Sequence, residues 1–261
     1  MKKVVSVAVL GLVSSAAFSQ AGSANVTLYG VVDAGYSRVS NTPGGTQNQV
    51  TSGLMEASRW GLTGSEDLGG GYRALYTVES RVEVDTGAGS NRPISGNAVP
   101  ARLLRGLPAT GAAGLAGAVG GLQGVNLGNN LFDRQAFVGL VTPFGGFLFG
   151  RQYTPAFQTM AAFDINETQS SAAPGGLGTL FYAPVEIRRS NSFQYVLRQG
   201  GISAAVMHAF GEAKTAVTPG SSGSLTGINA SYKANAFSVG LGVNTSKDFQ
   251  GRSSLKTTAV G

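Results

Sequence analysis

The sequence predicts an all-β protein, an antiparallel β-barrel that crosses a membrane with strands. Three observations carry this prediction: an N-terminal export signal, apolar residues that alternate with polar ones at a period of two, and short turns that alternate with long loops. Charged residues make up 12% of the chain, about half the usual share of a soluble domain, and glycine accounts for 40 of 261 residues. This composition disfavours an ordinary helical domain.

The N-terminus has the features of a secretory signal peptide. Two lysines precede an apolar run that continues to about Phe18, too short for a transmembrane helix of ~20 residues. Small residues on both sides of Phe18 place the cleavage site before Gln20, with a cut after Ala24 as the second choice. We therefore expect residues 1–19 to be a signal peptide and residues 20–261 to form the barrel domain.

The residue types disfavour an enzyme and a metal protein. The chain has no cysteine, so disulfides and thiolate metal sites are excluded, and its single histidine is His208. His208 lies on the outward face of its expected strand, where we interpret it as a membrane-interface residue. The net charge of +6 favours anions or anionic lipid as partners, because an exported protein seldom meets nucleic acid. We expect no catalytic residues, no cofactor and no metal.

Alternation marks the strands one after another. The clearest segments are Thr27–Ser37, Asp133–Val141, Ile202–Phe210, Gly227–Lys233 and Phe237–Thr245. In the last of these, large apolar residues alternate with Ser238, Gly240, Gly242 and Asn244. A strand of this kind turns one face to an apolar medium and the other to water. We count nine such strands, and Leu255–Gly261 begins a tenth.

Short turns and long loops separate these strands. Glycine or asparagine, which tolerate positive φ, occur in the expected turns Glu66–Gly71, Gln199–Gly201 and Ala234–Ala236. The expected loops are Arg38–Thr51, Val84–Leu131, Gln152–Glu186 and Ala213–Ser224. Turns on one side and loops on the other are typical of a membrane β-barrel.

A soluble β-sandwich also alternates, but the two faces argue against it. Aromatic residues near strand ends point outward, as an interfacial girdle requires: Tyr36, Trp60, Tyr72, Tyr76, Phe137, Tyr232 and Phe237. The opposite face carries charges that a dry core does not accept: Arg59, Arg73, Glu79, Arg81, Arg134 and Arg151. A water-filled lumen accepts them.

Five segments, in order and in spacing, resemble the general porins of β-proteobacteria. They are V-T-L-Y-G-V-V-D-A-G at 26–35, S-R-W-G-L-T-G-S-E-D-L-G-G-G at 58–71, D-R-Q-A-F-V-G-L at 133–140, F-G-R-Q-Y-T-P at 149–155 and N-S-F-Q-Y at 191–195. The resemblance implies a homotrimer of 16-stranded barrels in the Gram-negative outer membrane, in contact with lipid and lipopolysaccharide. It also implies passive diffusion of small hydrophilic solutes and ions, with a weak preference for anions.

The resemblance also assigns residues to the pore. Arg59, Arg134 and one of Arg188 and Arg189 align with arginines of the barrel wall, and alternation turns Arg151 inward as well. Alternation lets only one of the adjacent pair face the lumen. The third loop, Gln152–Glu186, is expected to fold inward and narrow the pore, with acidic residues Asp164 and Glu167 opposite the arginines.

Two features depart from the family pattern. The second long loop, Val84–Leu131, is longer than usual and rich in alanine and glycine. An alternative function follows from it, a substrate-specific channel or surface-binding barrel that uses this loop. The chain also stops at Gly261 without the closing strand and terminal aromatic residue of the family. We therefore expect a C-terminally truncated barrel.

Overall fold

The computed structural model describes residues 25–42, 45–89, 108, 110–111, 130–164, 186–211, 219–248 and 250–261. The predicted signal peptide, Glu167 and most of the loop Val84–Leu131 lie outside these residues. The described elements are β1 (Asn25–Val31), β2 (Ala34–Thr42), β3 (Gly45–Ser52), β4 (Arg59–Gly69), β5 (Tyr72–Arg81), β6 (Gln135–Thr142), β7 (Gly145–Tyr153), α3 (Pro155–Phe163), β8 (Arg188–Gln199), β9 (Ile202–Ala209), β10 (Leu225–Lys233), β11 (Ser238–Lys247) and β12 (Ser253–Val260).

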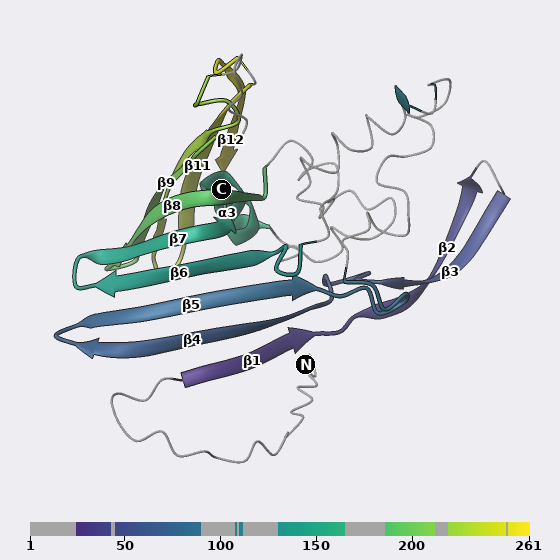
Figure 1. Ribbon diagram of the computed structural model, residues 1–261, viewed down its shortest axis with the longest axis horizontal. Coiled ribbons are helices and arrows are strands. Elements are labelled where there is room, and N and C mark those ends of the chain that lie inside the picture. The colour runs from purple at the N-terminus through teal and green to yellow at the C-terminus, as the bar shows by residue number, and fades with distance from the viewer. Residues whose placement is uncertain are drawn as a thin grey trace.

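Ten of these strands form one continuous antiparallel sheet, in the order β1-β4-β5-β6-β7-β8-β9-β10-β11-β12. The sheet curls into an arc, and the β2–β3 hairpin projects away from it (Figure 1). The predicted all-β antiparallel fold class is confirmed in this part of the chain. The sheet has ten strands, as the upper predicted count gives, and the β2–β3 hairpin brings the described strands to twelve. Within the described ranges, no helix is long and apolar enough to cross a membrane.

The two ends of the sheet differ in their connections. At one end, which we call the turn end, tight turns join β4 to β5, β6 to β7, β8 to β9 and β10 to β11. The β4–β5 turn requires glycine, because Gly69, Gly70 and Gly71 have φ of 80°, 62° and 82°. At the other end, the loop end, longer segments join β5 to β6, β7 to β8 and β9 to β10. The predicted segregation of turns and loops is therefore present.

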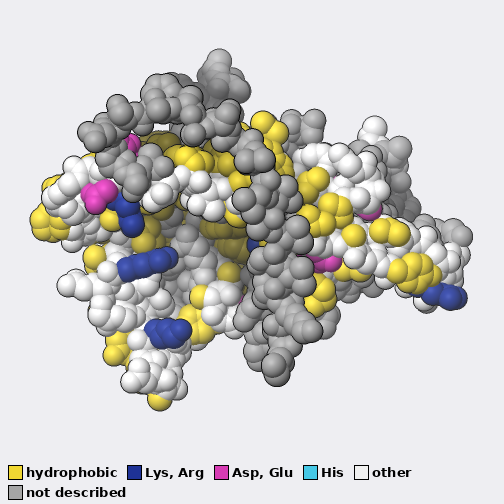
Figure 2. Space-filling model, turned by 90° about the horizontal axis from the view of Figure 1, so that it is seen from below, with side chains coloured by type: hydrophobic (Ala, Val, Ile, Leu, Met, Phe, Trp, Pro, Cys, Tyr) yellow, Lys and Arg dark blue, Asp and Glu magenta, His cyan; other side chains and the backbone are white. Residues whose placement is uncertain are grey.

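The register gives the sheet an apolar outer face. Leu28, Leu62 and Val78 lie in one row across β1, β4 and β5, and the same face continues through later strands. Its side chains are large, apolar and open to the surroundings, as Leu28 at 70% and Phe149 at 50% exposure show. Figure 2 shows hydrophobic side chains spread over much of one view of the molecule. A continuous apolar face of this extent indicates contact with lipid or with another subunit.

The concave inner face holds helix α3. The helix lies inside the arc (Figure 1) and packs on β9, β10, β11 and β12. Its close approach depends on Gly227, Gly240 and Gly242, which face inward beneath the helix. A Cβ on Gly242 would lie 3.0 Å from the Cα of Ala156 in the helix, closer than ordinary contact. The glycines that alternate with large apolar residues in the sequence therefore make room for the helix, and we call Gly227, Gly240 and Gly242 the glycine seat.

The first predicted strand is wrong in its extent. Thr27–Ser37 does not form one strand, because β1 ends at Val31 and the chain turns at Asp33. The Asp33 carboxylate accepts the backbone N–H groups of Met55 and Glu56, both at 2.6 Å. These bonds tie the base of the β2–β3 hairpin to the segment before β4. Most of the expected loop Arg38–Thr51 is consequently strand.

Two predicted girdle residues lie elsewhere. Tyr36 is on the hairpin, outside the ten-stranded sheet, and its hydroxyl donates a hydrogen bond to Asn48 Oδ1 at 2.7 Å. Phe137 faces inward, because it lies in register with Thr77 on β5 and Gly150 on β7. The positive φ of Gly150, 132°, leaves its backbone against the Cα of Phe137. The prediction that Phe137 points outward from β6 is therefore wrong.

Candidate functional site

Charged side chains of the inner face gather around Glu79 near the loop end. The Glu79 carboxylate is 4% exposed and accepts a hydrogen bond from Arg134 Nε at 2.6 Å. Arg59 Nε lies 3.6 Å from its other oxygen, which also accepts the Tyr29 hydroxyl at 2.9 Å. Strands β1, β4 and β5 and the entry to β6 thus position one carboxylate between two guanidinium groups. Such paired charges are far less costly to bury than single ones.

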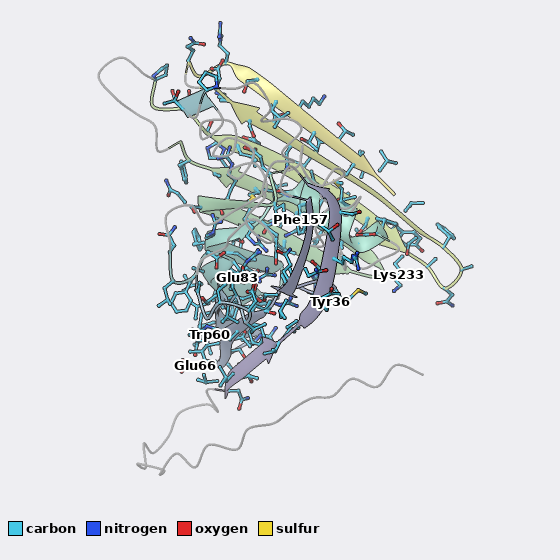
Figure 3. All side chains as sticks on the ribbon, turned by 90° about the vertical axis from the view of Figure 1, so that its right-hand side faces the viewer. Tyr36, Trp60, Glu66, Glu83, Phe157 and Lys233 are labelled. Carbon is cyan, nitrogen blue, oxygen red and sulfur yellow. The ribbon has the colours of Figure 1, made fainter. Side chains whose placement is uncertain are left out.

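Tyr153 links this cluster to Arg188 and to the helix. Its hydroxyl accepts hydrogen bonds from Arg134 Nη2 at 3.3 Å and from Arg188 Nη2 at 3.0 Å. The Arg188 guanidinium also lies over the Tyr153 ring, 4.6 Å from the centroid. On its other side the ring stacks on Phe157 of α3, with centroids 5.0 Å apart. Figure 3 shows Phe157 among the strands of the curved sheet, and Tyr153 links this helix residue to the two arginines.

Both members of the adjacent arginine pair reach inner-face acceptors. Arg188 binds Tyr153, and Arg189 Nη2 binds Glu186 Oε1 at 2.6 Å. The other Glu186 oxygen accepts the Ser246 hydroxyl from β11. The expectation that only one of the pair faces inward is wrong, because the β7–β8 ladder shifts register after Gly150 and Asn191 has φ of 52°. This irregularity interrupts the strict alternation on which the expectation depended.

Arg151 is a second correction. It lies in register with Ala136, on the outer face that also carries Phe149, and not in the lumen. Its Nε donates to the carbonyl oxygen of Asp133 at 2.6 Å, and its Nη1 donates to Ser190 Oγ at 2.9 Å. These bonds hold the guanidinium along the strand ends, so Arg151 is separated from the Glu79 cluster.

The helix is fixed to the opposite wall by side-chain amides. Asn244 Oδ1 accepts the Ala156 N–H at 3.1 Å, in place of a side-chain cap from the helix's own N-terminal residue. Asn229 Nδ2 donates to Pro155 O at 3.2 Å and to Gln158 Oε1 at 3.1 Å. The N-terminal end of the helix is therefore held by β10 and β11, and Tyr153, just before the helix, contacts the arginines.

The expected constriction-loop acids are only partly described. Asp164 directly follows the last residue of α3, at the end remote from Asn244. The helix carries it into the concavity, where the resemblance placed the third loop. Glu167 lies outside the described residues.

Four predicted girdle residues lie on the outer face near strand ends. Trp60 is the second residue of β4, at the loop end, and Tyr72, Tyr232 and Phe237 lie beside turns at the turn end. The rings of Tyr232 and Phe237 lie 6.0 Å apart. Tyr76 shares the outer face but lies within β5, in register with Val138, farther from either end.

Several important groups were missed by sequence reasoning. Tyr29, Tyr153 and Glu186 bind the arginines, and Asn244 and Asn229 hold the helix. Tyr29, Asn229 and Asn244 have inward parity in their strands, but the partners of Tyr29 and Asn244 lie 50 and 88 residues away. Tyr153 has the parity of the outward Arg151, and Glu186 precedes β8, so alternation could not find these two. Among the described residues, no group of acidic or histidine side chains could hold a metal ion. The paired charges and the inward helix can therefore supply an electric field and narrow the space inside the sheet.

Comparison with known proteins agrees with this geometry. The sequence matches the Gram-negative porin family over residues 6–261. It is 28% identical over 255 residues to outer membrane porin protein 32 of Delftia acidovorans, covering 94% of this chain and 60% of that protein. An outer membrane porin of Bordetella pertussis is 36% identical over 94 residues, or 31% of this chain and 24% of that protein. The chain thus spans less than two thirds of these curated relatives.

Solved structures show the same fold. The anion-selective porin from Comamonas acidovorans superposes with a TM-score of 0.61 at 24% identity, covering 86% of this chain and 59% of that one. A loop-deletion variant of the outer membrane protein OmpT of Vibrio cholerae gives a TM-score of 0.52 at 15% identity, covering 86% and 54%. With its apolar outer face, charged inner face and inward helix, the chain belongs to the Gram-negative porin family.

Proposed function

We propose that this protein forms a water-filled channel for passive diffusion of small hydrophilic solutes and ions, with a weak preference for anions. The observation that carries the proposal is the contrast between the two faces of one sheet. The outer face is apolar and exposed, whereas the inner face carries Arg59, Arg134 and Arg188 beside a helix that occupies the concavity. The wall of a membrane β-barrel has these two faces, one toward lipid and one toward water.

Family membership places the chain in the outer membrane of Gram-negative cells and confirms that it is not an enzyme. Within that membrane we propose a homotrimer, whose outer faces meet lipid, lipopolysaccharide and neighbouring subunits. The exposed apolar residues of β1 and β4, such as Leu28, support a contact of this kind.

The anion preference is proposed from the inner-face arginines and the carboxylates paired with them. Arginines on a pore wall favour anions, and acidic residues oppose them. Glu79 compensates part of the charge of Arg59 and Arg134, and Glu186 compensates Arg189. This compensation is why we propose a weak preference. The anion selectivity named for the Comamonas acidovorans structure supports the same sign.

The test is planar-bilayer conductance of the purified, refolded chain under a KCl gradient. We expect stepwise openings in groups of three and a reversal potential of the sign for anions. Replacing Arg59 or Arg134 by serine should lower the anion preference. A silent bilayer, with circular dichroism still reporting β-structure, would refute channel formation by this chain. An unchanged reversal potential in both variants would refute the role of the arginines.

A further inference from the structure

A second group of basic residues lies at the turn end of the inner face, away from the Glu79 cluster. Arg73 is the second residue of β5, Arg198 the penultimate residue of β8 and Lys233 the last residue of β10. Figure 2 shows Lys and Arg side chains gathered at this end, on the left of the view. We call these three residues the basic rim.

The register places the basic rim on the inner face. Arg73 lies in register with Val141, which pairs with Gly146 on the face of Leu148 and Gly139. Arg198 pairs with Ser203, which pairs with Ser231 of β10, two residues before Lys233. All three side chains therefore border the lumen and not the lipid.

The basic rim differs from the Glu79 cluster because its three charged groups form no ion pair within the described part of the chain. All three residues are exposed, and none forms an ion pair or side-chain hydrogen bond with another described residue. Asp67 lies opposite Arg73 on β4, but its Oδ1 accepts the Gly69 N–H at 2.8 Å and no ion pair joins the two side chains. In contrast, Arg134 is 6% exposed and bound to Glu79.

The three residues of the basic rim are spread along the turn-end edge of the sheet, where they can attract anions. Five strand intervals separate β5 from β10, so the rim extends over about 24 Å at roughly 4.8 Å per strand. Like charges at a pore mouth raise the local concentration of counter-ions and their rate of entry. Because the groups are exposed, their effect falls steeply as salt shortens the Debye length.

We propose that Arg73, Arg198 and Lys233 form an entry site for small, multiply charged anions at the turn-end mouth of the pore. This rim supplies most of the salt-sensitive part of the anion preference, whereas the paired arginines supply the salt-insensitive part. The inference rests on the proposed channel function, which it extends to a second site and a substrate class.

A binding measurement tests the rim without requiring conduction. The probe is a pyrene trisulfonate, followed by fluorescence anisotropy with the full refolded chain in neutral detergent. The triple variant Arg73→Gln, Arg198→Gln, Lys233→Gln should bind it roughly tenfold more weakly at low salt, with a shallower salt dependence. The single variant Lys233→Gln should lose part of that affinity. Arg38→Gln, which removes one charge from the exposed β2 strand, is the matched control and should bind as the wild type does.

Equal affinity of the wild type and the triple variant at low salt would overturn the proposal, as would an equal loss in the Arg38 control. Bilayer conductance then tests the channel function separately from anion binding at the rim. If the wild type binds the probe at the rim but gives no openings, the proposed channel function is refuted and only an anion-binding site at the rim remains. If it conducts and the triple variant keeps the wild-type reversal potential at low salt, the entry site fails and the channel stands.

Discussion

The glycine seat of α3 gives the sharpest prediction, a substitution that adds a single methyl group. In Gly242→Ala the new Cβ would lie 2.4 Å from Thr159 Oγ1 and 3.0 Å from the Cα of Ala156. The Thr159 side chain could rotate, but the Ala156 backbone moves only with the helix. Since carbon atoms pack best at about 3.5–4.0 Å, α3 must withdraw by roughly 0.5–1 Å toward the lumen.

This displacement has a cost in stability and an effect on conduction. Overpacking of a well-packed contact costs about 1–3 kcal/mol. The shift also stretches the bonds from Asn244 and Asn229 to the start of the helix, at 3.1 and 3.2 Å in the native chain. We expect a lower urea midpoint and a smaller single-channel conductance, because the helix moves into the space through which ions pass.

Gly146→Ala is the matched control. Gly146 also faces inward, but an added Cβ would meet only the carbonyl oxygen of Val196, at 4.0 Å. Urea unfolding in detergent and bilayer conductance should leave this variant at the wild-type values. Equal behaviour of the Gly242 and Gly146 variants would refute the argument that the glycine seat positions the helix.

Substitutions at three further sites separate the roles of neighbouring groups. Asn244→Leu leaves the Ala156 N–H without an acceptor, so the free energy of unfolding from urea titration should fall by about 1–3 kcal/mol. Asn244→Asp keeps the acceptor and should restore most of this loss, because the Asn244 Nδ2 has no partner among the described residues. Glu79→Gln leaves the buried Arg134 without its counter-charge, so the free energy of unfolding should fall by about 3–5 kcal/mol. The reversal potential should move toward stronger anion preference. An unchanged reversal potential would contradict this account. Arg151→Gln should leave the reversal potential as in the wild type, because this side chain lies on the outer face. A shift as large as that of Arg134→Gln would show that Arg151 does not face outward.

Much of the fold was predictable because residues on the two faces of a β-strand alternate along the sequence. The odd and even positions of 237–245 separate lipid-facing from lumen-facing residues without any knowledge of the partner strands. The same reasoning located the turns at 199–201 and 234–236 and turned Arg59 and Glu79 inward.

The errors arose where local geometry departs from simple alternation. Arg151 lies at the register shift between Gly150 and Gln152, and Phe137 was assigned to the wrong face of its strand. Tyr36 lies beyond a turn that Asp33 stabilises through hydrogen bonds to residues 22 and 23 positions later. No periodicity within one segment reports such bonds.

By itself, the sequence determined the fold class, the apolar and polar faces, the family, and the presence of inward-facing arginines, since these follow from composition and from a period of two along each strand. Only the tertiary structure decided which charges are compensated and where the helix rests. The pairing of Arg134 with Glu79 and of Ala156 with Asn244 joins residues 55 and 88 positions apart. Such contacts depend on the curvature and register of the whole sheet, so the balance of charge in the pore is a property of the folded wall and not of any one strand.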